Sequence, residues 1–100
     1  MPKSAFIILK SPQDLDPTHA IKRFSESGDA SAILLEDGVY QALVDESSKK
    51  LKESANEVMV SREDLEARGF VPQDLKAGRA VEYADMIDCI MERTERTITL

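Results

Sequence analysis

The sequence predicts a single α/β domain of three layers (α/β/α), with a mostly parallel sheet of about five strands. Two continuous aliphatic runs, at residues 5–9 and 30–35, are typical of parallel strands that are buried on both faces. Helical apolar spacing follows each run, so strands and helices alternate along the chain. The 100 residues leave room for one domain, over 1–100.

The first strand and helix have clear boundary signals. Residues 5–9 predict the central strand, and Asp16 and Pro17 open a helix. The Asp16 carboxylate can cap the first free backbone N–H groups, and Pro17 has no N–H to leave unpaired. Gly28 then ends this helix.

The later elements follow from the same kinds of signal. Residues 30–35 predict the second strand, and spacing over 39–55 predicts a helix that the polar segment 46–50 divides in two. Ser61 followed by Asp64 resembles a helix-capping arrangement. The remaining expected elements are a helix at 62–68 that stops at Gly69, a loop at 72–78, a helix at 85–95, and strands at 57–60, 80–83 and 97–100.

Composition excludes several classes of protein. The chain carries 13 basic and 19 acidic residues, a net charge of −6, and so lacks the basic footprint of direct nucleic-acid binding. A single cysteine forms no disulfide framework and fits a reducing, cytoplasmic compartment. No segment has the length of a membrane span, and the apolar stretch near the N-terminus is too short for a signal peptide.

Sites for cofactors and metals are not expected. The loop after the first strand, residues 10–16, has no glycine, which a phosphate-binding loop needs for close backbone approach. Glu36 and Asp37 could form a general acid/base or metal pair, but neighbours on extended chain point to opposite faces. The favoured interpretation is that Asp37 caps the next helix while Gly38 relieves the turn.

Histidine and cysteine are side chains often used in catalysis, but neither His19 nor Cys89 is expected to take part in it. His19 should be exposed on the first helix, with no nucleophile beside it in sequence. The last helix should bury Tyr83, Met86, Ile87, Ile90 and Met91. Cys89 then falls on the flank of that stripe, among acidic residues that disfavour a reactive thiolate. We therefore expect Cys89 to be dispensable for the fold and not to carry a persulfide.

Four sequence blocks resemble, in the same order, the DsrH/TusB branch of the DsrE-like sulfur-relay proteins. They are LKSP at 9–12, LEDGVY at 35–40, DLEARGF at 64–70 and EYADMID at 82–88. The resemblance implies a DsrE-like fold and a non-catalytic subunit of a complex that passes persulfide sulfur, toward tRNA 2-thiouridine or in sulfur oxidation. It also implies DsrE/TusD-like and DsrF/TusC-like partners. The outer strands of so small a domain leave unpaired backbone groups to cover, so we expect assembly with these partners, or self-association, rather than a monomer.

The resemblance also shows what this chain lacks. Some members of the branch have a cysteine on the first helix, where this chain has Ala20 and Ile21. Two alternatives stay open: a sulfurtransferase that uses Cys89 as persulfide carrier, and a stand-alone homo-oligomer that binds a small ligand at the carboxyl edge of the sheet. The expected docking surface lies in the loops at that edge, at Lys10, Ser11, Glu36, Asp37, Gly38 and Tyr40.

Overall fold

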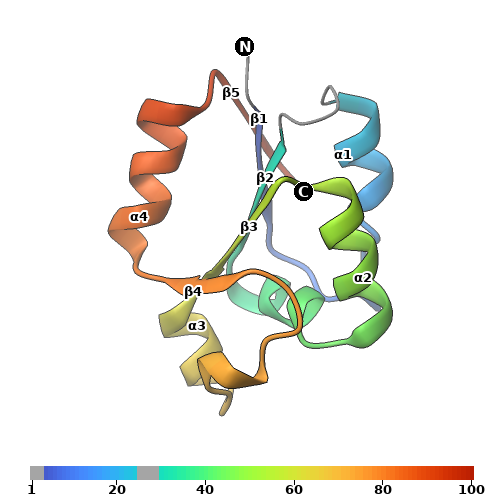
Figure 1. Cartoon of the computed structure of the whole chain (residues 1–100), viewed down its shortest axis with the longest axis vertical. Coiled ribbons are helices and arrows are strands. Elements are labelled where there is room, and N and C mark those ends of the chain that lie inside the picture. The colour runs from blue at the N-terminus through green and yellow to red at the C-terminus, as the bar shows by residue number, and fades with distance from the viewer. Residues whose placement is uncertain (1–3, 25–29) are drawn as a thin grey trace.

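The computed structural model describes residues 4–24 and 30–100, and its centre is a sheet of five strands (Figure 1). The spatial order is β4-β3-β2-β1-β5, and every pairing is parallel. The expectation of a mostly parallel sheet is confirmed. The strands are β1 (Ser4–Ile8), β2 (Ala30–Leu34), β3 (Glu57–Ser61), β4 (Arg79–Val81) and β5 (Arg96–Thr99).

Strand β1 is interior, between β2 and β5, but the middle position belongs to β2. All five residues of β2 are buried, as are four of the five in β1. Strand β5 pairs only with β1 and mostly exposes its side chains. The continuous apolar runs therefore identified two of the three interior strands, but the prediction that residues 5–9 form the central strand is wrong. The third interior strand, β3, lies between β2 and β4 and has no such run.

Helices cover both faces of the sheet. Helices α1 (Thr18–Phe24) and α2 (Asp45–Ser54) lie on one face, and α4 (Tyr83–Asp88) lies on the other (Figure 1). Because parallel crossovers are right-handed, the connection that returns from β4 to the far edge at β5 must place its helix on the opposite face. The remaining helical segments are α3 (Arg62–Ala67), the 3₁₀ turns η1 (Glu36–Ala42) and η2 (Pro72–Asp74), and the π-helical turn η3 (Cys89–Arg93).

The apolar core has one part on each face. The larger cluster, on the face of α1 and α2, includes Phe6, Ile8, Leu34 and Leu51. The smaller cluster lies under α4 and consists of Ala5, Ile33, Met59, Val81, Met86 and Cys89. Alternate residues of β1 and β2 enter opposite clusters, so the sheet is the middle of three layers, as predicted.

The predicted helix over 39–55 is interrupted, but not where expected. The chain forms η1, turns at Leu43 and Val44, and then begins α2 at Asp45. The polar segment 46–50 lies inside α2 instead of breaking it. Asp45 and Glu46 occupy the first turn, where the helix dipole favours negative charge, so these polar residues start a helix.

Three local boundary signals are confirmed. Asp16 Oδ1 accepts the backbone N–H of Thr18 at 3.0 Å, which caps the start of α1. Ser61 Oγ accepts the N–H of Asp64 at 3.2 Å at the start of α3. Gly69 ends α3 with φ +84°, and its N–H donates to the carbonyl of Glu66 as a helix-terminating turn requires. Gly28, the fourth signal, lies outside the described residues.

Replacing Asp16 with alanine should lower the free energy of unfolding by about 1 kcal/mol, the usual value of a helix cap. The side-chain hydrogen bond from Thr18, with its backbone N–H, lowers the pKa of Asp16 below its usual 3.8. This contribution is therefore complete above pH 3.8 and is lost as the pH falls through the lower, folded-state pKa.

The matched control for this effect is Asp16→Asn, which keeps the accepting oxygen but cannot ionise. Urea denaturation between about pH 6 and about pH 3 should show a stability difference between wild type and Asp16→Asn that shrinks on acidification. A difference that grows as the pH falls would contradict the assigned role of the ionised cap.

Helix α4 is rotated relative to the sequence prediction. Tyr83, Ile87 and Met91 were expected to be buried, but they are 62%, 44% and 75% exposed. Met86 is buried, at 2% exposure, as predicted, and Cys89 is buried with it, at 0% exposure. The apolar residues span an arc of the helix wider than its line of contact with the sheet, and the buried part is the side nearest Cys89.

Candidate functional site

An open groove of about 770 Å³ lies where the loop after β1 meets η1, at the carboxyl edge of the sheet. Its walls combine Pro12, Tyr40 and the exposed Val44 with the carboxylates of Asp14 and Asp37. Such a mixture of apolar surface and acidic rim is suited to contact with another protein rather than to bond chemistry.

The groove brings together three of the six predicted docking residues. Ser11, Asp37 and Tyr40 line it, although they are separated by up to 29 positions in the chain. Lys10, Glu36 and Gly38 do not line it. Lys10 exposes its side chain and uses its backbone carbonyl to accept the side-chain N–H of Gln41, at 3.1 Å.

Gly38 is needed for close packing, not for an unusual turn. It is buried, and a Cβ atom at this position would lie 1.9 Å from the carbonyl oxygen of Ile8. The positive φ in this turn, 51°, belongs to Glu36, whose backbone N–H donates to Asp64 Oδ2 at 2.8 Å. The expectation that Gly38 relieves the turn is therefore wrong, because Glu36 adopts the left-handed conformation.

Asp37 does not cap a helix. The N-cap position of η1 is Leu35, and no side chain caps it. Instead, Asp37 Oδ1 accepts two hydrogen bonds from the Arg68 guanidinium, from Nε at 3.2 Å and from Nη2 at 3.0 Å. This pair links η1 to the end of α3 and fixes one wall of the groove. The capping interpretation of Asp37 was wrong for this reason.

The groove has a firm aromatic support. Tyr40 is half-buried, and its ring meets that of Phe70 edge to face, with centroids 6.0 Å apart. Edge-to-face geometry is favourable for aromatic pairs and holds the Tyr40 ring in one orientation. Arg68 and Phe70 both lie within the block 64–70 that carried the family resemblance, and their contacts were not predicted from sequence.

Gln41 is a further residue that sequence reasoning missed. It is 1% exposed, and its Nε2 donates to the carbonyls of Lys10 and Leu15 at 3.1 and 2.9 Å. It therefore holds the loop after β1 against η1 and fixes the distance between them. A polar side chain flanked by apolar residues of a predicted helix is the sequence feature that could have indicated a buried structural role for Gln41.

Among the described residues, no cluster of three His, Cys, Asp or Glu side chains could hold a metal ion. His19 is exposed, as predicted. Within the described parts of the chain, no helix is long and apolar enough to cross a membrane.

Cys89 is fully buried rather than on the flank of its helix. It packs in the cluster with Ala5, Ile33 and Met59 beneath α4. Burial in apolar surroundings favours an inert thiol, because nucleophilic cysteines need access and a stabilised thiolate. The predicted position of Cys89 was wrong.

In the native protein, Cys89 should react with iodoacetamide at least about 100-fold more slowly than in the unfolded chain, because α4 must open before the thiol is reached. Alkylation followed by mass spectrometry, with and without urea, measures this protection. Labelling at similar rates in both conditions would mean that α4 opens readily and exposes the thiol.

The geometry defines a class of protein: a small parallel α/β domain with a buried thiol and an open, acid-rimmed groove. A family model described as "DsrH like protein" matches residues 10–96. The chain therefore belongs to the DsrH-like family, which confirms the resemblance seen in the sequence. At the level of the family, this supports a role as a sulfur-relay subunit. None of the curated proteins matches the chain.

Proposed function

We propose that this protein is a non-catalytic subunit of a sulfur-relay complex. The complex passes persulfide sulfur between its other subunits, and this subunit does not carry the sulfur. The observation that carries the proposal is the burial of the chain's single thiol, Cys89, in the cluster under α4, whereas the open groove at the carboxyl edge of the sheet is lined by other residues. A carrier must expose its thiolate to accept and release sulfane sulfur. The contribution of this subunit is then one of shape and contact.

The partners proposed are DsrE-like and DsrF-like subunits, in a cytoplasmic oligomer that serves tRNA thiolation or sulfur oxidation. The groove supports docking because its walls are fixed before a partner arrives: Arg68 holds Asp37, and Phe70 supports Tyr40. A surface that is already ordered loses little conformational entropy on binding. The exposed side chains of Tyr83 and Ile87 on α4 and of Met91 on η3 form a second apolar surface, which is the main competitor for this role.

The alternative, a sulfurtransferase that uses Cys89, requires α4 to lift from the sheet in each cycle. That motion would expose Ala5, Ile33 and Met59 together with the thiol. The described residues that pack around Cys89 are apolar, so none of them is a base that would offset the cost of exposing this apolar surface.

The decisive experiment is reconstitution of the relay with DsrE-like and DsrF-like subunits from the same host and with ³⁵S-labelled persulfide donor. Cys89→Ala keeps the site apolar and should leave sulfur transfer within about twofold of wild type. We prefer it to Cys89→Ser, which would bury an additional hydroxyl group. Abolished transfer with intact assembly would replace the docking proposal with the sulfurtransferase one.

A further inference from the structure

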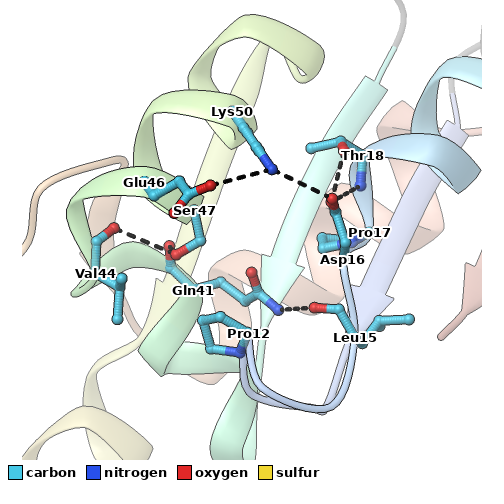
Figure 2. Close-up of a pocket in the computed structure, with 10 residues that line it drawn as sticks. All are labelled: Pro12, Leu15, Asp16, Pro17, Thr18, Gln41, Val44, Glu46, Ser47 and Lys50. Atoms are coloured by element: carbon cyan, nitrogen blue, oxygen red, sulfur yellow. Dashed lines mark hydrogen bonds and ion pairs between the residues drawn. The ribbon is translucent and has the colours of Figure 1, made fainter.

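A second hollow, smaller and somewhat less open than the groove, lies between the start of α1 and the start of α2 (Figure 2). It has a volume of about 170 Å³. The hydroxyl and charged side chains around it are those of Asp16, Thr18, Glu46, Ser47 and Lys50, and Gln41 forms its inner end. This is more space than one water molecule needs, and less than a drug-sized ligand fills.

The amide oxygen of Gln41 is the distinctive group in this pocket. The Gln41 side chain is 1% exposed, and both carbonyls that its amide contacts are acceptors, so its nitrogen must face them. The oxygen then points the other way, into the pocket on the side of Lys50 (Figure 2). Within residues 4–24 and 30–100, no hydrogen-bond donor meets this oxygen. A buried acceptor of this kind calls for a donor.

The two hydroxyl groups of the pocket already donate to other atoms of the protein. The Thr18 hydroxyl donates to Asp16 Oδ1, and the Ser47 hydroxyl donates to the backbone carbonyl of Gln41. Lys50 is the cationic side chain that lines the pocket, and its Nζ lies 3.6 Å from both Asp16 Oδ2 and Glu46 Oε1. Charge-assisted hydrogen bonds are normally about 2.7–2.9 Å long, so Lys50 is only loosely held there. Two carboxylates therefore share one displaceable ammonium group.

We infer that this pocket binds a small organic cation that carries N–H donors, such as a guanidinium or a primary ammonium group. One N–H of the ligand donates to Gln41 Oε1, and its charge replaces that of Lys50 between Asp16 and Glu46. The apolar rings of Pro12 and Pro17 and the side chain of Leu15 bound the space available for its carbon atoms. This inference does not depend on the proposed role in sulfur relay.

Methylguanidinium is the probe, and tetramethylammonium is its control, since it has the same charge but no N–H. In ¹H–¹⁵N NMR titrations, methylguanidinium should shift the Gln41 side-chain amide and Thr18 with a dissociation constant on the order of 1 mM, as suits a ligand of about five heavy atoms. Tetramethylammonium should bind at least about 10-fold more weakly, because it cannot donate to Gln41.

Two variants of equal charge separate the pocket from general attraction to an acidic protein. Lys50→Gln removes the competing ammonium and should tighten methylguanidinium binding about 3- to 10-fold. Lys49→Gln, at an exposed neighbour that does not line the pocket, should leave it unchanged within about twofold. Gln41→Leu should abolish binding, and its thermal unfolding must be measured in parallel because Gln41 also holds the loop.

Three results would overturn the inference. The first is equal binding of both cations, with shifts spread over the acidic surface. The second is an equal gain in affinity for Lys49→Gln and Lys50→Gln. The third is a crystal soaked with methylguanidinium in which an ordered water only, and no ligand, donates to Gln41 Oε1.

Discussion

Gly38→Ala should lower the free energy of unfolding by about 3 kcal/mol, the upper end of what overpacking a filled interior costs. The added methyl group would lie 1.9 Å from the carbonyl oxygen of Ile8 and 2.7 Å from its carbonyl carbon. These are backbone atoms at the end of an interior strand, and the same oxygen accepts the N–H of Leu35 at 3.1 Å. Relief of the clash would have to separate η1 from β1.

Gly69→Ala is the matched control for this substitution. Gly69 has φ +84°, but a Cβ atom there would meet nothing within 4 Å. Its cost should be about 1 kcal/mol, which reflects backbone strain alone. Urea denaturation of both variants compares crowding with strain. If Gly38→Ala were no more costly than Gly69→Ala, the close approach of η1 to β1 would be absent from the native protein.

Tyr40→Ala should weaken assembly with the proposed DsrE-like and DsrF-like partners by about 10- to 100-fold, since tyrosines at interface centres often dominate binding. The ring lies in the groove and is held by Phe70, so its removal deletes both contact area and a fixed wall. Analytical ultracentrifugation of the mixed subunits measures the loss. A fall in stability of about 1 kcal/mol is expected from the lost aromatic pair, and thermal unfolding measures it separately.

The chain offers a control of the same residue type. Tyr83, the second of its two tyrosines, is 62% exposed on α4, which covers the face of the sheet opposite α1 and α2 (Figure 1). Tyr83→Ala should change neither assembly nor stability by a measurable amount. If Tyr83→Ala weakens assembly and Tyr40→Ala does not, the partner binds α4 and the groove is the wrong surface. If the wild-type chain binds neither subunit, the proposed function fails.

The charges around the two candidate surfaces also bear on the kind of partner that each would fit. The exposed apolar residues of α4 and η3 are flanked by the acidic side chains of Asp85, Asp88 and Glu92, all exposed. The groove is rimmed by Asp14 and Asp37. The α4 surface therefore disfavours contact with an identical copy through the same face, because like charges would meet, whereas Arg68 already pairs with Asp37 at the groove. A partner with basic residues around an apolar contact would fit either surface better.

Much of the architecture could be predicted from sequence because its signals are local. The doubly buried runs of β1 and β2 are continuous in the chain, and the caps at Asp16 and Ser61 act on backbone groups two or three residues away. Parallel strand pairing and right-handed crossovers then leave few ways to arrange five such strands. The four-block resemblance to the DsrH family also required only the order of residues along the chain.

The site depended on contacts between distant segments, which no local pattern contains. Asp37 meets Arg68 across 31 positions of sequence, and this pairing takes the carboxylate away from a capping role. Gly38 is constrained by Ile8, and the burial of Gln41 depends on carbonyls at Lys10 and Leu15. The rotation of α4 that buries Cys89 and exposes Tyr83 was likewise undetermined, because an apolar arc wider than the contact line permits several orientations. Only packing against the side chains that the sheet presents on that face, Ala5, Ile33, Met59 and Val81, selects one of them.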